Sequence, residues 1–511
     1  MAATSHPLAT ATALSVLRSG GNAVDAAIAA SATLCTVEPH MTGIGGDCFV
    51  ILVEPDGKVY GLNGSGRAPA AATAEKYRAL GHDAVPEFGP LSITAPGAIR
   101  AWEALRDRFG TRGFDALFAD AVRYAEEGFA IHPRVARDWV NCVEDLARDE
   151  GGRLHCLADG AAPALGARFS TPAFGATLRA IAKGGANAFY EGEIAAEMAK
   201  VVQAKGGFLA EEDLAEAAAD WVEPIALDYA GYDILEIPPN GQGITALILL
   251  GLMDRLCVRN AGADSALRHH LQIEAARLAY SVRDHLVSDP ATMTATPAQI
   301  LSDAHLDALA ARIDPERRAT DIVLPKLPDA DTIYLTVVDR DRRAVSFINS
   351  VYDGFGSRVV MPKGGFALQN RGACFSLEVG HPNELGPRKR PMHTIIPAMA
   401  MRKGRVAISF GVMGGAYQPM GHAHVLANMV DFGMDPQAAL DHARLFWDED
   451  EVLAAESGIG ADVRDGLAKR GHVLRDAGSP HGGGQVIVVD HESGFLIGGS
   501  DPRKDGLALG W

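Results

Sequence analysis

Basic residues, paired cysteines and long apolar runs are all scarce in this sequence. Lysine and arginine number 47 against 64 aspartates and glutamates, and the resulting net charge of −17 repels nucleic acid. No run of 18 apolar residues is free of charge, so no membrane-spanning helix is expected. The first ten residues, MAATSHPLAT, lack the basic start and the apolar stretch of a signal peptide. We therefore expect a soluble, cytoplasmic protein with neither nucleic acid nor a membrane as its partner.

Metal and cofactor sites are not predicted either. The six cysteines stand singly, without the CxxC pair that is typical of zinc and redox sites. His422 and His424 would supply two metal ligands from a strand, but their segment is predicted to be a helix, on which the side chains diverge. The loop MTGIGGD at 41–47 lacks the GK[ST] ending of a phosphate-binding loop. No metal, nucleotide or other cofactor is therefore expected.

The chain is rich in apolar residues (48%) and in glycine (56 of 511), which predicts a large core with many tight turns. Hydrophobic periodicity predicts two helices over 7–35 and a hairpin over 49–62. Residues 96–320 are predicted to be mainly helical. Most strands are expected after Thr320, at 332–339, 344–354, 365–369, 398–402, 405–410, 484–490 and 494–499, with two helices among them. This mixture predicts a layered α/β sandwich with helices outside.

Eight short motifs carry a more specific signal. They are GGNAVDAA at 20–27, a glycine loop at 43–46, TAPG at 94–97, DTIYLTVVD at 331–339, FGSRVV at 355–360, GPRKRP at 386–391, GVMGG at 411–415 and GGSDPR at 498–503. Together they resemble the γ-glutamyltransferase family of N-terminal-nucleophile hydrolases, in the family's order over about 480 residues. The resemblance implies a four-layer αββα sandwich, formed as one heterodimeric unit from a self-cleaved precursor.

The family's precursor cuts itself before a threonine, and the matching residue here is Thr332. The cut would leave a helix-rich large chain, 1–331, and a small chain, 332–511, which stay together as partners. A threonine hydroxyl is a poor nucleophile near pH 7, and cleavage supplies a base in the form of the residue's own α-amino group, whose reference pKa is about 7.7–8.0. From patterning alone, Thr332 is equally a β-branched residue that opens a strand.

The resemblance also assigns the groups that assist the nucleophile. Ser350 matches the second hydroxyl that orients the nucleophile through a hydrogen bond. Gly414 and Gly415 match the pair whose backbone N–H groups form the oxyanion hole, a place that suits glycine because no side chain obstructs the substrate. Without the resemblance, the two glycines read as an ordinary tight turn.

Several substrate-binding positions depart from the family pattern. Ser65 stands where the carboxylate-binding arginine would fall, although Arg67 lies two residues later. Cys374 replaces the acidic residue that holds the substrate ammonium group, and a neutral thiol cannot form that ion pair. His393 and Thr394 replace paired serines, and Tyr352 replaces an asparagine. Glutathione-type chemistry therefore loses its expected contacts.

The remaining charged candidates, Arg67 and Arg371, suit an acyl group that bears a carboxylate but no amine. This pattern, with the phrase GGAYQPMGHAH at 414–424, resembles the acylase and oxamate-amidohydrolase branch of the family. The first hypothesis is thus a self-cleaved amidohydrolase that acts on small oxamate-type or glutaryl-type amides. A γ-glutamyltransferase or glutathione hydrolase, and an uncleaved non-catalytic relative, are the alternatives. For each arginine alone, a surface charge or a structural ion pair is the competing interpretation.

Overall fold

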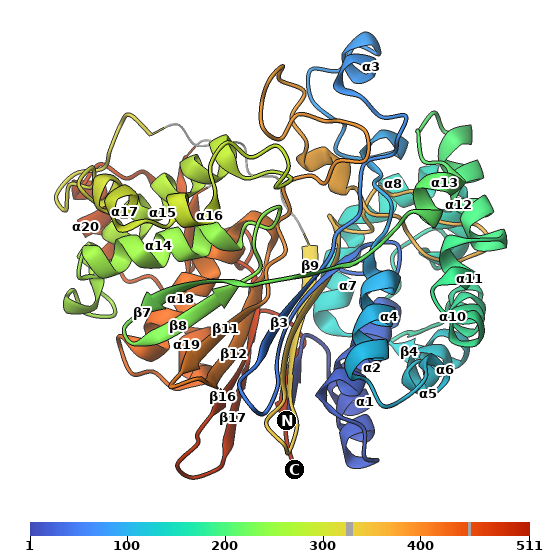
Figure 1. Ribbon diagram of the computed structural model, residues 1–511, viewed down its shortest axis with the longest axis horizontal. Coiled ribbons are helices and arrows are strands. Elements are labelled where there is room, and N and C mark those ends of the chain that lie inside the picture. Colours follow the sequence, from blue (N-terminus) through green and yellow to red (C-terminus); the bar gives the residue numbers. More distant parts are fainter. Residues whose placement is uncertain (323–330, 448–450) are drawn as a thin grey trace.

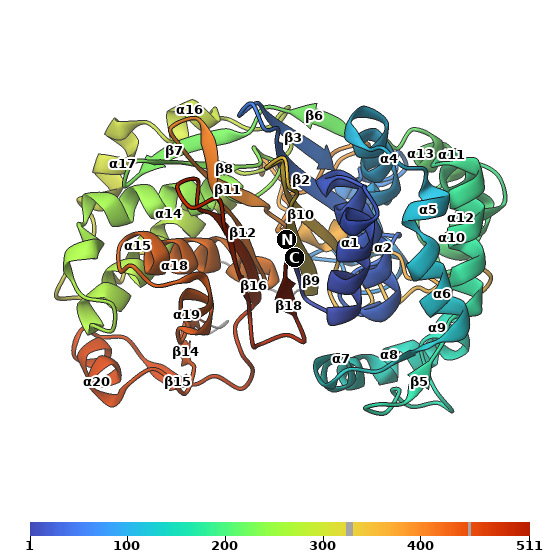
Figure 2. The ribbon, with the colours of Figure 1, turned by 90° about the horizontal axis from the view of Figure 1, so that it is seen from below.

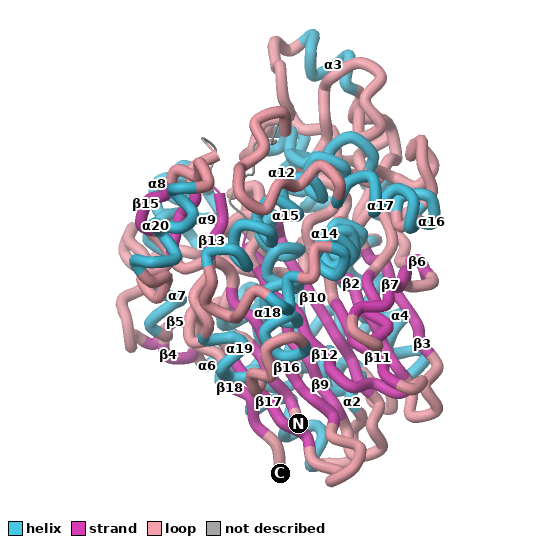
Figure 3. Tube along the Cα trace, turned by 90° about the vertical axis from the view of Figure 1, so that its left-hand side faces the viewer, coloured by secondary structure: helices cyan, strands magenta, loops and turns pink. Residues whose placement is uncertain are grey.

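Two β-sheets stand face to face between two layers of helices in the computed structural model, which describes residues 1–322, 331–447 and 451–511 (Figure 1). Figure 3 shows the same arrangement from the side, with the strands of both sheets running through the middle and the helices around them. The predicted four-layer αββα sandwich is therefore confirmed. Within the described residues, no helix combines the length and the apolar character needed to cross a membrane.

The first sheet has seven strands, all antiparallel to their neighbours. Their order is β18 (Leu507–Leu509), β1 (Ala2–Thr4), β9 (Asp331–Val338), β10 (Ala344–Tyr352), β2 (Asp47–Val53), β3 (Val59–Gly64) and β6 (Asp220–Val222). The central strands β2 and β10 are buried along their whole length, as strands covered on both faces must be.

The second sheet has six strands, again antiparallel. Their order is β17 (Leu496–Ser500), β16 (Gly483–Val489), β12 (Arg405–Met413), β11 (Ala398–Arg402), β8 (Tyr232–Glu236) and β7 (Ile225–Tyr229). A small sheet of β13 (Leu445–Trp447), β14 (Leu453–Ala455) and β15 (Leu474–Asp476), and the pair β4 (Phe129–Ala130) and β5 (Arg168–Phe169), lie outside the two layers.

The helices of residues 7–215 lie on the side of the first sheet (Figure 1). Helix α2 is buried along all of its length because it packs against the sheet on one side and against α1 and α6 on the other. Its start is fixed by a capping box between Asn22 and Asp25. The helices of this side are α1 (Pro7–Arg18), α2 (Ala23–Val37), α3 (Ala74–Ala79), α4 (Ala98–Phe109), α5 (Phe114–Leu117), α6 (Ala119–Glu127), α7 (Pro133–Trp139), α8 (Val143–Arg148), α9 (Glu150–His155), α10 (Pro172–Gly184), α11 (Asn187–Tyr190), α12 (Glu193–Ala204) and α13 (Glu211–Ala215).

The other helices cover the second sheet, with α14 against β7 and β8 and with α18 against β12. They are α14 (Gly243–Arg255), α15 (Ala266–Leu286), α16 (Pro297–Ile300), α17 (Asp303–Ala310), α18 (Gln418–Val430), α19 (Pro436–Asp441) and α20 (Ala461–Lys469). Short 3₁₀ turns η4 (Arg371–Cys374) and η5 (Gly415–Tyr417) lie at the gap between the layers.

The inner faces of the two sheets meet along β9 and β12. The hydroxyls of Thr336 and Ser409 lie 2.6 Å apart, and the ring of Tyr334 lies against Gly411, where an added Cβ would come within 2.4 Å of the ring. Alternate residues of β9 therefore face the second sheet. The register places the start of β9 opposite the end of β12.

Both sheets contain strands from each side of the 331–332 junction. In the first sheet, β9 lies between β1 and β10, and in the second β11 pairs with β8. Figure 2 shows the two chain ends side by side at the middle of the molecule, where β1 and β18 meet.

The sequence predicted the helices at 7–35, the first hairpin and the pair β9–β10 correctly. Residues 96–320 are mainly helical, as predicted, from α4 to α17. The region also contains β6, β7 and β8, which the pattern did not reveal because these strands are short and only partly buried. One expectation was wrong. Residues 365–369, predicted as a strand, form only isolated bridges, because a turn at Gly365 with φ of 69° interrupts them.

Candidate active site

Thr332 lies at the start of β9 with its side chain fully buried between the sheets. Its hydroxyl donates a hydrogen bond of 3.2 Å to the Ser350 hydroxyl on the neighbouring strand β10. In the β9–β10 register Asn349 pairs with Ile333, so the next residue of β10, Ser350, lies beside Thr332 before the register shifts toward Tyr352. The structure thus brings together the two hydroxyls that the sequence singled out.

The Ser350 hydroxyl is also fixed from two further directions. The backbone N–H of Tyr352 donates to its oxygen at 2.9 Å, and Nη2 of Arg371 lies 3.4 Å away. Tyr352 has a φ of 86°, a conformation that a bulky residue rarely adopts, so the chain turns sharply directly after Ser350. Strand, turn and cation together hold this oxygen in place.

Arg371, the first residue of η4, is completely buried. Its Nη1 donates to the Thr394 hydroxyl at 2.7 Å, and the ring of Tyr352 stacks on the guanidinium with its centroid 4.2 Å away. The Nε atom has no hydrogen-bond partner, and no ion pair among the described residues includes Arg371. A buried cation without a counter-ion is costly, so this place suits an anionic ligand.

Cys374 ends η4, and its thiol lies 4.0 Å from Nη1 of Arg371. The side chain is partly exposed and carries no disulfide. Burial, reinforced by the neighbouring Cys374, holds the pKa of Tyr352 well above its ordinary value, so the phenol stays neutral. Among the residues that the structure describes, the surroundings of Arg371 therefore contain hydroxyls, a thiol and an aromatic ring, but no carboxylate in hydrogen-bond contact with it.

His393 is also part of this group, but both of its ring nitrogens are engaged. Nε2 lies 3.0 Å from a carboxylate oxygen of Asp47, and Nδ1 accepts from the backbone N–H of Ile395 at 3.3 Å. Burial and the nearby charge of Arg371 lower the pKa of His393 to about 4, against the opposing effect of Asp47. At neutral pH the imidazole is uncharged and adds no second cation.

Asp47 connects several loops around the site, a role that the sequence did not reveal. The residue pairs directly with Ser350 across β2 and β10. One of its oxygens accepts from the backbone N–H groups of Gly66 and Gly97 and from the side chain of Gln369 at 2.9–3.0 Å. Glycine is required at both backbone donors, since an added Cβ would come within 2.2 Å of a carbonyl oxygen. The only sequence signal was an acid at the end of a glycine loop.

Gly414 and Gly415 form the link from β12 to η5, with φ values of 119° and 52°. The carbonyl of Gly414 accepts from the N–H of Tyr417 at 2.9 Å, so the N–H of Gly415, in the same peptide plane, points away from the following helix. These N–H groups lie at the start of η5 and α18, where the helix leaves donors unpaired and carries a partial positive charge. The contacts of Thr336 with Ser409 and of Tyr334 with Gly411 run toward the start of β9 and the end of β12, which this link follows.

Gln242 connects the Gly414–Gly415 link with Thr394, the residue that accepts a hydrogen bond from Arg371. Its Nε2 donates to the carbonyls of Thr394 at 2.6 Å and Gly415 at 2.9 Å, while its Oε1 accepts from Arg283 at 2.8 Å. The residue is fully buried in the loop after β8 and directly precedes α14 as its N-cap. Nothing in the sequence motifs pointed to it.

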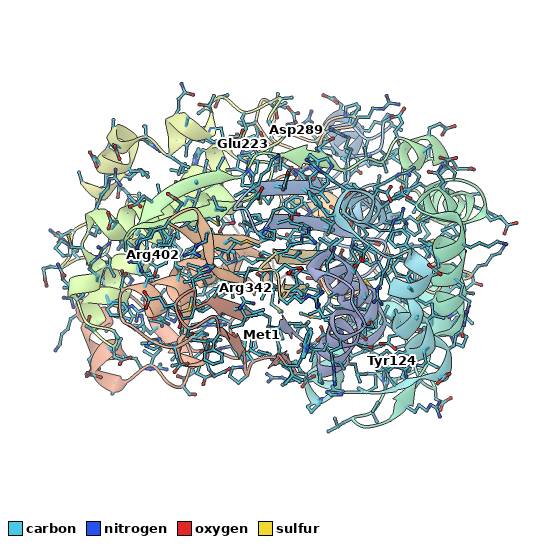
Figure 4. All side chains as sticks on the ribbon, turned by 60° about the horizontal axis from the view of Figure 1, so that its bottom comes forward. Met1, Tyr124, Glu223, Asp289, Arg342 and Arg402 are labelled. Atoms are coloured by element: carbon cyan, nitrogen blue, oxygen red, sulfur yellow. The ribbon has the colours of Figure 1, made fainter. Side chains whose placement is uncertain are left out.

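Arg67 lies apart from these residues. Its side chain is half exposed, donates to the carbonyl of Arg388 at 3.0 Å and approaches Asp220 and Asp289 within 4 Å. Asp289 lies toward the upper edge of Figure 4. Arg67 and Ser65 line a cavity of about 280 Å³, whose lining includes neither Thr332 nor Arg371. The two arginines that the sequence grouped together thus face different surroundings.

His422 and His424 lie on α18, as the helix prediction required. They diverge: His422 contacts Glu236 at 2.7 Å, whereas His424 contacts His442 at 3.3 Å. In the part of the chain that the structure describes, no three metal-ligating side chains come together.

The sequence and the fold of this chain are similar to those of known proteins. The gamma-glutamyltranspeptidase family model matches residues 9–511. The "Oxamate amidohydrolase proenzyme" of Klebsiella pneumoniae is 36% identical, and the "Glutathione hydrolase-like YwrD proenzyme" of Bacillus subtilis is 34% identical; each alignment covers all of this chain and 98% of the relative. The crystal structure of cephalosporin acylase from Bacillus halodurans superposes with a TM-score of 0.93 at 39% identity, covering all of this chain and 95% of the acylase.

Proposed function

Because this chain belongs to the gamma-glutamyltranspeptidase family of amide-bond hydrolases and transferases, we propose that it is a self-cleaved amidohydrolase for small acyl groups that bear a carboxylate. The observation that carries the proposal is the buried hydroxyl pair Thr332–Ser350 beside Arg371, a buried guanidinium with no carboxylate partner among the described residues.

Self-cleavage is proposed between Asp331 and Thr332, leaving chains 1–331 and 332–511 as a heterodimer. The new α-amino group of Thr332 accepts the hydroxyl proton as the oxygen attacks the amide carbonyl. The N–H groups of Gly414 and Gly415 stabilise the oxyanion, and the amine leaves with a proton. Water then attacks the acyl ester, releases the acid and restores Thr332. Two of the relatives, named proenzymes, support the processing step.

The acyl carboxylate is proposed to bind Arg371, whose guanidinium is held in place by the Thr394 hydroxyl and by the stacked ring of Tyr352. Cys374 offers no charge to a substrate ammonium group, which argues against free γ-glutamyl donors. Arg67 is not proposed to contact the acyl group. His393 is proposed to act as a positioning residue through its contact with Asp47. A γ-glutamyl hydrolase remains the second candidate because several relatives are named glutathione hydrolases.

Denaturing electrophoresis tests the processing step. Dividing 53.8 kDa in proportion to chain length predicts bands of about 35 and about 19 kDa. Thr332→Ala should give one full-length band and no amide hydrolysis, whereas Thr332→Ser keeps a hydroxyl and should still be cut. An active wild-type enzyme that stays as one intact chain would refute the proposal and leave the uncleaved alternative.

A parallel assay separates the two enzymatic candidates. Ammonia release from oxamate supports the amidohydrolase, whereas efficient release of p-nitroaniline from γ-glutamyl-p-nitroanilide, without oxamate hydrolysis, supports the glutamyl enzyme.

The cytoplasm is proposed as the compartment of the enzyme. None of the six cysteines is joined in a disulfide, a state that is typical of proteins in a reducing environment.

A further inference from the structure

We infer that this site selects its acyl group by length, and that its best substrates are monoamides of two- and three-carbon diacids. The inference rests on the proposed function, because it takes Thr332 as the nucleophile and Arg371 as the carboxylate contact. It adds a limit on how far the carboxylate can lie from the carbonyl under attack.

The limit follows from two contacts that share one atom. The Ser350 oxygen lies 3.2 Å from the Thr332 oxygen and 3.4 Å from Nη2 of Arg371. The guanidinium nitrogen therefore lies at most about 6.6 Å from the nucleophile, whatever the angle at Ser350. Because strand β10, the turn at Tyr352 and the stacked tyrosine ring fix these groups, the distance cannot lengthen freely.

The guanidinium presents one suitable edge. Nη1 is occupied by Thr394 and approaches Cys374. Within the described part of the chain, Nε has no partner and Nη2 makes only its 3.4 Å contact with Ser350. Nε and Nη2 together form the fork that holds a carboxylate through two parallel hydrogen bonds. An anion bound there sits on the side of Arg371 that includes its contact with Ser350, and hence close to Thr332.

Substrate length can be compared with this span. Attack begins with the nucleophile about 3 Å from the carbonyl carbon, each covalent bond advances about 1.2 Å along an extended chain, and the charged hydrogen bond adds about 2.8 Å. Because the nucleophile attacks roughly perpendicular to the amide plane and the other joints bend by roughly 110–120°, the span from nucleophile to guanidinium nitrogen is about 6 Å for oxamate, 7 Å for malonamate, 8 Å for succinamate and 9 Å for glutaramate. Oxamate fits within the 6.6 Å limit and malonamate exceeds it by only about 0.4 Å, whereas the two longer amides exceed it by more than about 1 Å.

The two nearby basic side chains of the described residues offer longer acyl chains no alternative cation. Arg283 is paired with Asp284 at 2.7 Å, and His393 is neutral. A glutaryl group would have to fold back on itself or leave Arg371 unpaired, and either choice weakens binding in the transition state.

A chain-length series with the wild-type enzyme tests the inference. Ammonia release is measured from oxamate, malonamate, succinamate and glutaramate, and kcat/KM is compared. We expect the maximum at oxamate or malonamate and a value at least 100-fold lower for glutaramate. A glutaramate value within 100-fold of the best substrate overturns the length limit but leaves the amidohydrolase intact. Hydrolysis of none of the four amides overturns the proposed function, and the inference with it.

A variant of Arg371 gives a second readout. Oxamide has the shape of oxamate without the carboxylate, so the ratio of their kcat/KM values reports the charge contact rather than general damage. Arg371→Gln should lower the oxamate-to-oxamide ratio at least tenfold, and Arg371→Lys, which keeps charge but loses the fork, should lower it less. Arg402→Gln on the exposed end of β11, labelled in Figure 4, is the matched control. A smaller change than tenfold in Arg371→Gln overturns the assignment.

Discussion

Replacing Cys374 with aspartate should convert the arginine site into an internal ion pair. The thiol lies 4.0 Å from Nη1 of Arg371, and at that distance two unit charges attract by about 4 kcal/mol in a medium with a dielectric constant of about 20. Since Cys374 is partly exposed, solvent screening reduces this to roughly 2 kcal/mol. The new carboxylate at Nη1 neutralises the charge that holds the substrate carboxylate on the other edge of the guanidinium, so kcat/KM for oxamate should fall about 30-fold.

Cys374→Asn provides the matched control, because it has the shape of aspartate without the charge. Steady-state ammonia release from oxamate is measured for both variants and for the wild type. The aspartate variant should be about 30-fold less active than the asparagine variant, mainly through KM, and should gain on γ-glutamyl-p-nitroanilide, whose ammonium group it can pair with. Equal kcat/KM values for oxamate in the two variants would refute the claim that Arg371 holds the acyl carboxylate.

Two other variants probe the supporting network. Gln242→Leu removes the donor to the carbonyls of Thr394 and Gly415, so kcat should fall about tenfold or more with little change in the cut; a change confined to KM contradicts this. His393→Gln tests the buried imidazole by urea unfolding at pH 7 and pH 4.5. The folded pKa of about 4 lies below the usual 6.5, so the wild type loses up to about 3 kcal/mol as the pH falls through this window, and the variant should lose less. Parallel losses in both proteins would show that His393 does not titrate as described.

The sequence predicted those parts of the fold that depend on local patterning. An apolar repeat and the Asn22–Asp25 cap predict the helices over 7–35. The β-branched residues on either side of a charged turn predict β9 and β10. The strands at 220–236 gave no such signal because they are short and lie toward the sheet edge, where one face meets solvent.

The candidate site depended on motifs more than on patterning. The structure brings Thr332, Ser350 and Arg371 into one group and places Arg67 elsewhere. The sequence alone does not show which of the two arginines lies beside the nucleophile. The same holds for Asp47 and Gln242. Their importance comes from hydrogen bonds to loops that are far away in the chain. Only tertiary contacts could reveal them.

A cut at the proposed 331–332 junction would have to follow folding, because strands from both sides of this junction alternate within each sheet. Neither half of a cut chain owns a complete sheet, because β1 is enclosed by β18 and β9, and β8 borders β11. Assembly must therefore finish while the chain is still continuous. After cleavage and denaturation, the two chains would have to associate from solution and form every strand pair again. Thermal unfolding of the cleaved protein is therefore expected to be irreversible.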